Sequence, residues 1–365
     1  MKKQVVVGLL LSLVAVFFLA VPSEAVKFRY EDLGTLGGNQ DYSSGGFRQI
    51  GINDLGQVVG MSHTAGGDSH AFLKSPGKAM QELPLLSGTI ESQAYCINHS
   101  GLIGGYYNLY DGTDDHACKW QLMPGPIYQV IDLGVGGGSE AYGLNDAGYF
   151  VGVARNSGYQ HAHVLPPVGN AQDLGTLPGH HGSIAKGINS SGTIVGYSFD
   201  SSYINTACYW SPSGGSWAAA VSLFGVANSV AISINSQGQA VGYVISSGDS
   251  HAVLQSLGQP LQYLGSFVSP QGSGQAYDIN DSGWVVGWSS GYAGLRASLW
   301  TSNGGAQDLN KLTVNLPTGV ILYYAMAINK RGEIAGYMAT SGSDINGVFK
   351  LTPIPEPPLS LLLFD

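Results

Sequence analysis

The sequence predicts an all-β protein, a seven-bladed β-propeller built from four-stranded antiparallel blades. Three observations support this prediction: one stretch recurs seven times, its copies are spaced like propeller blades, and the composition favours strands and turns. The 365 residues include 54 Gly and 20 Tyr, and 44% are hydrophobic while only 11% are charged. Such a chain is poor in helix formers and has ample apolar surface to bury, so we expect a folded β protein.

The recurring stretch is clearest at residues 185–197, Ala-Lys-Gly-Ile-Asn-Ser-Ser-Gly-Thr-Ile-Val-Gly-Tyr. Its pattern is Ala-x-x-aliphatic-Asn-x-x-Gly-x-x-x-Gly, and each anchor Asn is followed by one Gly three residues later, such as Gly56, and another seven residues later, such as Gly60. The anchors are Asn53, Asn98, Asn145, Asn189, Asn235, Asn280 and Asn329. Their spacing of 44 to 49 residues is the period of a propeller blade.

Each unit contains four strand-like segments. The first ends at the anchor Asn, and Asn-x-x-Gly is predicted to be a tight turn whose Asn and Gly occupy positions that require positive φ. The second strand contains the second Gly, which in five copies precedes a large aromatic residue: Tyr106, Tyr197, Tyr243, Trp288 and Tyr337. The third carries His-Ala or a variant, as at residues 70–72, and the fourth carries Asp-Leu or a variant, as at residues 132–133.

The segment at residues 27–34 is a spare fourth strand that precedes the first anchor, whereas the last unit has no fourth strand after Phe349. We therefore expect residues 27–34 to supply the outer strand of the blade formed by residues 325–351. This pairing would close the ring and cover two strand edges. An open β-solenoid is the alternative, although solenoid coils are usually shorter than this repeat.

Residues 1–25 have the pattern of a secretory signal peptide: Lys2 and Lys3, an apolar run, and the small-x-small site Ser23-Glu24-Ala25. An uncleaved membrane anchor is the alternative. With the signal removed, we expect residues 26–352 to form the propeller and residues 353–365 to form a Pro-rich tail. The processed protein is then expected to be an exported monomer that is not an integral membrane protein.

The tail begins Pro-Ile-Pro-Glu-Pro-Pro at residue 353 and continues Leu-Ser-Leu-Leu-Leu-Phe. It resembles the start of the PEP-CTERM sorting signal of Gram-negative bacteria, but lacks the full membrane helix and the basic cluster. The resemblance implies secretion to the outside or the cell surface of such a bacterium. The seven apolar-rich residues alone are too few to cross a bilayer, which takes about 20.

A second resemblance covers residues 27–351. Asp-Leu-Gly-Thr-Leu-Gly-Gly at residues 32–38, the Gly-Ile-Asn-x-x-Gly-x-Val-Val-Gly pattern and His-Ala-Phe at residues 70–72 are similar to the extracellular HAF-repeat family. That family consists of exported bacterial repeat proteins without an established activity. The resemblance therefore implies a fold and a location, but no particular reaction.

The formal net charge of −9 disfavours a nucleic-acid partner, because such proteins need clustered Lys and Arg. The three cysteines, Cys96, Cys118 and Cys208, are expected to be unpaired small hydrophobes in strands. The recurring histidines, at His70, His116, His161 and His251, and the recurring aspartates, at Asp32, Asp132, Asp173 and Asp308, are interpreted as structural. Histidines on separate blades would be too far apart to share a metal ion.

Candidate ligand-binding residues gather in the loops that do not repeat. In an up-and-down blade, the loop from strand two to strand three and the loop to the next blade open on one face, and function commonly lies in such loops. The candidates there are Tyr107, Tyr110, Asp111, Asp114, Asp115, His180, His181 and Tyr292. Exposed tyrosines beside carboxylates would suit sugar rings, and the acidic cluster at residues 111–115 is a candidate Ca²⁺ site, although a solvated loop is the simpler interpretation.

The sequence therefore predicts a non-catalytic binding propeller whose partner is a cell-surface or extracellular polymer or a protein. No catalytic residue is assigned, because no nucleophile, phosphate-loop or zinc-protease motif is present. Two alternatives remain: a glycosidase-like hydrolase with paired carboxylates at the mouth of the channel, and a structural component of the extracellular matrix.

Overall fold

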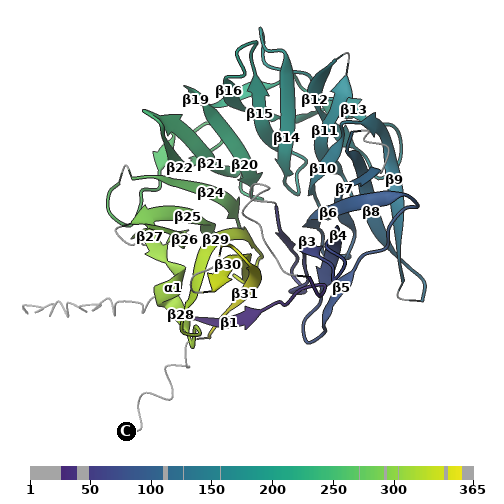
Figure 1. The fold of residues 1–365 in the computed structure, drawn as a ribbon. Helices are drawn as coiled ribbons and strands as arrows, with labels where there is room; N and C mark the ends of the chain where they lie inside the picture. The colour runs from purple at the N-terminus through teal and green to yellow at the C-terminus, as the bar shows by residue number, and fades with distance from the viewer. Residues whose placement is uncertain are drawn as a thin grey trace, which may run out of the picture.

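A computed structural model describes residues 26–38, 49–109, 114–125, 127–156, 158–270, 272–291, 294–302, 304–340 and 344–355. Seven blades of mainly antiparallel strands follow one another around a central axis, as predicted, and the first two blades join into one eight-stranded sheet (Figure 1). Within the described residues, no helix is long and apolar enough to cross a membrane, and the one helix, α1 (Leu309–Leu312), has four residues. The signal-peptide pattern lies outside the described residues, so the boundary at residue 25 stays a prediction.

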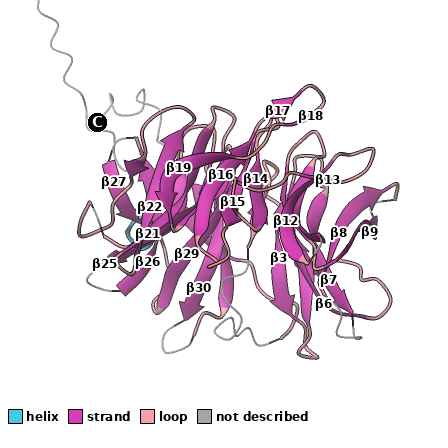
Figure 2. Cartoon of the chain, turned by 90° about the horizontal axis from the view of Figure 1, so that it is seen from above, coloured by secondary structure: helices cyan, strands magenta, loops and turns pink. Residues whose placement is uncertain are grey.

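The first blade comprises β2 (Gly51–Ile52), β3 (Val58–His63), β4 (Ser69–Lys74) and β5 (Met80–Glu82). The second comprises β6 (Thr89–Ile97), β7 (Ile103–Leu109), β8 (His116–Met123) and β9 (Ile127–Gly137). The third comprises β10 (Glu140–Leu144), β11 (Phe150–Asn156), β12 (Tyr159–Leu165) and β13 (Gln172–Asp173). The fourth comprises β14 (Gly182–Ile188), β15 (Ile194–Phe199), β16 (Asn205–Trp210) and β19 (Val221–Ala227). A small hairpin, β17 (Pro212–Ser213) and β18 (Ser216–Trp217), projects from one face of the ring beside this blade (Figure 2).

The fifth and sixth blades are formed by β20 (Ser229–Ile234), β21 (Gln239–Ser246), β22 (Asp249–Ser256) and β23 (Gln262–Tyr263), and by β24 (Gly274–Ile279), β25 (Val285–Gly291), β26 (Gly294–Thr301) and β27 (Gly304–Asp308). The seventh contains β29 (Val320–Ile328), β30 (Ile334–Thr340) and β31 (Gly347–Pro353). Apolar side chains fill the spaces between consecutive blades, as where Val151 and Val164 of the third blade pack in one cluster with Ala185 and Ile194 of the fourth.

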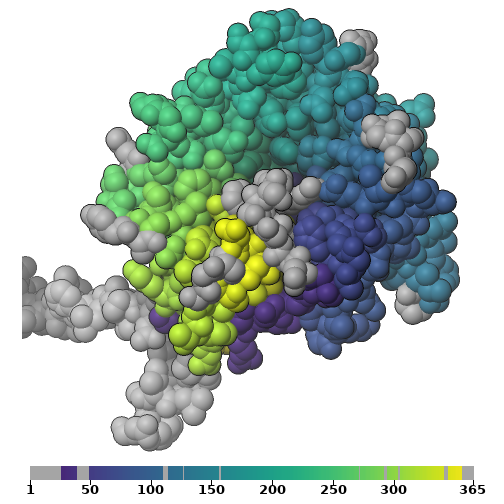
Figure 3. Space-filling view, viewed as in Figure 1, coloured from purple at the N-terminus to yellow at the C-terminus, as the bar shows by residue number. Residues whose placement is uncertain are grey.

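The seventh blade is completed by the N-terminal strand, which confirms the predicted closure. Strand β1 (Phe28–Asp32) pairs antiparallel with β31, from Phe28 opposite Pro353 to Asp32 opposite Phe349. Strand β28 (Thr313–Val314) then pairs with the outer side of β1 in parallel. In the space-filling view the purple N-terminal segment lies against the yellow end of the chain (Figure 3). The pairing covers the edge of β31 that would otherwise be exposed and the edge of β1 that faces it.

The anchor asparagines form a closed ring of hydrogen bonds, which the sequence analysis did not predict. All seven are buried, and the Nδ2 of each donates to the backbone oxygen of the anchor in the next blade over 2.9 to 3.3 Å. The last donor, Asn329, reaches Asn53 and completes the circle. Each Oδ1 accepts the N–H four residues further along its own turn. One side chain therefore both shapes a turn and joins two blades.

The two glycines of the repeat have different tasks. The first, as expected, has positive φ in every copy, between 73° and 84°. The expectation that the Asn also needs positive φ is wrong, because no anchor has it and its role is in hydrogen bonding. The second Gly lies opposite an irregularity in the first strand: a Cβ on Gly196 would meet the Ile184 oxygen at 2.0 Å, and five other copies are similar. Any side chain there would displace the inner strand.

The repeated His and Asp residues meet across the outer strands. Nδ1 of His161 lies 2.8 Å from Oδ2 of Asp173, and the equivalent pair, His70 and Glu82, is 2.6 Å apart. The other Asp173 oxygen accepts the N–H of Gly175, which explains Asp-Leu-Gly as one turn unit. These contacts give His70 and His161 a structural role in joining the third strand to the fourth, whereas His116 stacks on Tyr107 and Nδ1 of His251 has no hydrogen-bond partner among the described residues.

The three cysteines are unpaired, as predicted. Cys118 and Cys208 are fully buried, and burial raises the pKa of both thiols, so they behave as small hydrophobes. Cys96 differs, because it is only half-buried and borders the central channel.

Candidate functional site

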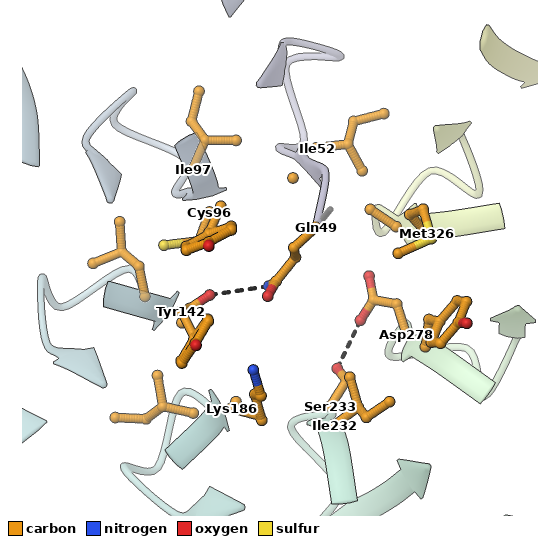
Figure 4. Close-up of a pocket in the computed structure, with 18 of the residues that line it drawn as sticks. Gln49, Ile52, Cys96, Ile97, Tyr142, Lys186, Ile232, Ser233, Asp278 and Met326 are labelled. Carbon is orange, nitrogen blue, oxygen red and sulfur yellow. Dashed lines mark hydrogen bonds between the residues drawn. The ribbon is translucent and has the colours of Figure 1, made fainter. Parts of the chain in front are cut away.

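The blades surround a central channel with a volume of about 1020 Å³. Its wall is made by the first strand of every blade together with the turn that follows the anchor Asn. Figure 4 looks along this channel and shows side chains from all sides converging on it. This volume is just above the usual range for ligand-binding cavities, which is about 300–1,000 Å³.

The largest side chains contributed by the inner strands occupy one variable position of the repeat, three residues before the anchor Asn. They are Ile50, Tyr95, Tyr142, Lys186, Ile232, Tyr277 and Met326. In blades two to seven this residue is skipped in the pairing of the first and second strands, so it is the extra residue of a β-bulge. A bulge redirects a side chain, and in these six blades it presents Tyr, Lys, Ile and Met side chains to one cavity.

Tyrosines and carboxylates dominate the wall at blades two and three. The hydroxyl of Tyr95 donates to Oε2 of Glu140 at 2.5 Å, and the hydroxyl of Tyr106 donates to Oε1 of Glu91 at 2.9 Å. The Tyr95 ring centroid lies 5.1 Å from that of Tyr142 and 5.6 Å from that of Tyr106. Burial, followed by the Glu140 charge, raises the pKa of Tyr95 and Tyr142. These phenols are therefore neutral hydrogen-bond donors at ordinary pH.

A lysine lies among these rings. The ammonium of Lys186 is 3.3 Å from the centroid of the Tyr142 ring, within range of a cation–π interaction. Burial lowers the pKa of Lys186 to about 8, while the charge of Glu140 acts in the opposite direction. Among the described residues, no hydrogen bond or ion pair engages this ammonium. Lys186 therefore carries unused donors into the channel.

The opposite wall contains one buried carboxyl whose oxygens are occupied. Oδ1 of Asp278 accepts the hydroxyl of Ser233 at 2.6 Å and the N–H of Ile279 at 2.9 Å, and Oδ2 accepts the N–H of Ile328 at 2.9 Å. Burial raises the pKa of Asp278 to about 6 despite these hydrogen bonds. Because Ser233 and Ile328 belong to the two adjacent blades, Asp278 acts as a tie between three blades. Figure 4 shows its hydrogen bond with Ser233.

Gln49 reaches into the channel from the segment that leads into β2. Its Nε2 donates to the backbone oxygen of Tyr142 at 3.0 Å, two blades away, and its own backbone oxygen accepts Nε2 of Gln93 at 3.1 Å. In Figure 4 its amide and the Lys186 ammonium both lie beside Tyr142, on the side that faces the middle of the channel. These two polar groups border the central part of the cavity.

The rim beyond the Asn ring is polar and also linked from blade to blade. The N–H of Lys330 donates to Oδ1 of Asp54 at 3.0 Å, and its ammonium lies 3.6 Å from Asp54 and 4.0 Å from Asp146. The N–H of His99 donates to Asp146 at 3.0 Å. These carboxylates are used in joining blades. Within the described part of the chain, no group of three or more His, Cys, Asp or Glu side chains could hold a metal ion.

The structure does not bring the predicted loop residues together as one site. Tyr110, Asp111 and Tyr292 lie outside the described residues, so the candidate Ca²⁺ site at residues 111–115 is described only at its last two residues. The expectation that Tyr107 is exposed is wrong: it is 6% exposed, its hydroxyl donates to Asp132 at 2.6 Å, and its ring stacks on His116. Tyr106 lines the channel, and because side chains alternate along a strand, the next residue, Tyr107, points to the opposite face.

The remaining candidates are separate from one another. Asp114 forms an ion pair with Arg155 of the third blade at 2.9 Å, whereas Asp115 accepts Nδ2 of Asn108 and borders the channel. His180 and His181 lie in the predicted loop, where His181 stacks on Tyr159 with ring centroids 5.6 Å apart. Of the described candidates, Asp115 alone lines the channel.

The channel residues were missed although the sequence contains a signal for them. The motif Ala-x-x-aliphatic-Asn holds two variable residues inside an otherwise constant stretch, and the first of them is the bulge residue. Variation at a fixed structural position is what a binding wall requires. These positions can be identified as a channel wall only when it is known that this strand is the innermost of its blade and contains a bulge.

The fold and this channel define the protein as a closed β-propeller. It is similar to the β-propeller domain of the Trilobed protease from Pyrococcus furiosus, with a TM-score of 0.55 and 9% identity over 88% of this chain and 99% of that one. It is also similar to a structure of prolyl endopeptidases, with a TM-score of 0.54 and 13% identity over 86% of this chain and 48% of that one. The BP39L lectin from Burkholderia pseudomallei has a TM-score of 0.46 and 12% identity over 82% and 98%.

These likenesses show the fold alone. The propeller domain of the Trilobed protease has an open velcro topology, whereas here β1 and β31 close the ring by pairing. No protein-family model and no curated protein matches this sequence.

Proposed function

We propose that the protein is an exported, non-catalytic binding protein that holds part of a cell-surface or extracellular glycan in its central channel. The observation that carries the proposal is the set of seven side chains three residues before the anchor Asn, six of them at bulges, which places tyrosines, a lysine, isoleucines and a methionine around one ligand-sized cavity. Flat aromatic faces with hydrogen-bonding groups between them suit sugar rings. The N-terminal signal pattern and the resemblance to HAF repeats support the exported location.

The variable loops contribute the entrance in this proposal. Glu91, near the start of β6, and Asp115, directly before β8, line the cavity, so the loop-bearing face opens into it. A polymer bound across the loops could therefore place one residue of its chain in the channel. Specificity would then come from the bulge side chains, and the loops would hold the flanking residues.

A glycosidase-like reaction has less support. A hydrolase needs one carboxyl free to donate a proton and a second free to attack or to activate water. Both oxygens of Asp278 accept hydrogen bonds from Ser233 or from backbone N–H groups, and Glu140 and Glu91 accept tyrosine hydroxyls. These interactions favour positioning roles. A purely structural matrix role would leave the varied wall without a purpose.

The test is a glycan array probed with the full chain, followed by calorimetry on the hits. Ile232→Trp fills the channel from one bulge position without changing charge, and Val168→Trp, at a residue that is 89% exposed, is the matched control. We expect Ile232→Trp to abolish binding while the control binds as the wild type does. Absence of any hit, or equal binding by both variants, would reject the proposed function.

A further inference from the structure

The polar groups of the channel wall are unequally matched. The carboxylates there have donors: Glu140 receives the Tyr95 hydroxyl, Glu91 receives the Tyr106 hydroxyl, and Asp115 receives the Asn108 amide. The ammonium of Lys186 has only the face of Tyr142. This ammonium has three N–H donors and no oxygen acceptor among the described residues, so it can donate hydrogen bonds to a ligand in the channel.

The surroundings restrict what that acceptor is. Glu140 lies close enough to influence the pKa of Lys186, and Asp115 that of Tyr142, so the site contains more negative than positive side chains. The two carboxylates would repel a dianionic phosphate more strongly than a group with one negative charge. Another ammonium would compete with Lys186 for the Tyr142 ring. A single carboxylate is the group that fits best.

The neighbouring side chains provide flat surfaces for the rest of such a ligand. Tyr142, Tyr197, Tyr243 and Tyr277 all line the cavity, and Ile232 adds an apolar side chain beside Lys186 (Figure 4). A pyranose ring presents apolar C–H faces that stack on such rings, and its hydroxyls can bond to the Gln49 amide. Ring and carboxylate together describe a uronic acid.

We propose that Lys186 binds the carboxylate of a uronic acid residue in an acidic extracellular polysaccharide. The inference rests on the proposed function and specifies the ligand class of the same channel. Lys186 is a recognition residue in this proposal, with its stem fixed by the bulge of β14 and its ammonium directed by the Tyr142 ring.

The position of Lys186 is poor for stability, which supports a function in binding. Its pKa is lower in the folded protein than in the unfolded chain. The contribution of Lys186 to the stability of the fold is therefore fully present above its ordinary pKa of 10.5 and is lost as pH falls through about 8. At pH 7 the buried charge consequently destabilises the folded protein. Lys186→Met keeps the apolar stem, and we expect it to melt at the same temperature as the wild type or higher at pH 7.

The experiment compares trisaccharides of galacturonate, glucuronate and mannuronate with their neutral methyl esters, by calorimetry on the full chain. For the wild type we expect at least one acid to bind about 10- to 100-fold more tightly than its ester, the range for one hydrogen bond to a charged group. Lys186→Met should bind acid and ester equally, and Lys186→Arg should restore part of the preference. Equal melting temperatures would exclude unfolding as the cause.

The outcomes separate this inference from the proposed function. A wild type that binds esters as well as acids, or a Lys186→Met variant that keeps the preference for acids, overturns uronate recognition. Neutral glycans on the array that bind in the channel, without any binding of uronates, also overturn it while the proposed function stands. A wild type that binds no glycan overturns both.

Discussion

Replacing one anchor asparagine separates its two structural roles. Asn189 accepts the N–H groups of Ser191 and Thr193 at 3.1 and 2.9 Å and donates to the backbone oxygen of Asn235 at 3.1 Å. Asn189→Asp keeps an acceptor for the turn but loses the donor to the next blade and buries a charge. Asn189→Ala loses both roles.

The magnitude follows from what each variant leaves unpaired. In Asn189→Ala the buried Thr193 N–H loses its acceptor, while Ser191 is exposed and water can replace its partner. One buried unsatisfied group costs about 1–3 kcal/mol and a lost buried hydrogen bond about 1 kcal/mol, so we expect a loss of roughly 2–4 kcal/mol. Asn189→Asp should lose at least as much, because a carboxylate there faces the Asn235 oxygen.

The assay is urea unfolding at pH 7, followed by far-UV circular dichroism and tryptophan fluorescence. The control is Ser190→Ala, a change at the exposed adjacent residue, for which we expect less than about 0.5 kcal/mol. If Asn189→Asp unfolds like the control, the link between blades contributes nothing and the ring of amides is incidental. If Asn189→Ala does so as well, the turn role is also refuted.

Four further predictions follow from the same structure. Gly196→Ala should destabilise the fold by about 1–3 kcal/mol because its Cβ would meet the Ile184 oxygen, whereas Gly305→Ala, with nothing within 4 Å, should not change the melting temperature. Deleting residues 27–34 should abolish the cooperative thermal transition, since β31 loses its partner; an unchanged melting curve would contradict the closure. The pKa of Asp278 is raised to about 6, so its contribution to stability is complete below its ordinary pKa of 3.8 and is lost as pH rises through 6. In urea titrations over that window, the free energy of unfolding of the wild type should fall relative to that of Asp278→Asn by up to about 1.4 kcal/mol per pH unit. A difference that does not change with pH would contradict this. Binding of a uronate should weaken about tenfold per pH unit above 8 as Lys186 loses its proton, because burial keeps the nearby tyrosines Tyr142 and Tyr197 neutral there; a flat calorimetric profile from pH 7 to 10 would contradict it.

Much of the fold could be predicted because the repeat reports local chemistry. The positive-φ Gly, the aliphatic residue before the Asn and the spacing of the copies determine turns, inner strands and the number of blades. The spare strand at residues 27–34 could be matched to the blade that lacked one by counting alone. The structure confirms that match through the pairing of β1 with β31.

The second role of the Asn could not be predicted in the same way. Turn chemistry accounts for Oδ1, and a single repeat contains no partner for Nδ2. The partner is the equivalent residue about 45 positions away, which comes close only when the ring has formed. The same limit applies to the second Gly. A side chain is excluded there because the bulge of the neighbouring strand brings a backbone oxygen too close.

The binding wall was missed because alternation along a strand fails at a bulge. Regular alternation would treat the residues between Ala185 and Ile188 as spacers, whereas the irregular register turns Lys186 toward the axis. The sequence pattern favours loop residues such as Tyr107, because they vary and are aromatic. The structure buries Tyr107 between strands and leaves the varied positions inside the motif to face the cavity.

The most direct test of the account is a calorimetric comparison of a channel variant with a loop-face variant against the same glycan. Ile232→Trp occupies the cavity, and the double change Tyr159→Ala and His181→Ala removes the aromatic stack on the loop-bearing face. The account predicts that Ile232→Trp loses binding and that the double variant keeps an affinity within a few-fold of the wild type. Loss of binding in the double variant, with full affinity in Ile232→Trp, would place the site on the loops and contradict it.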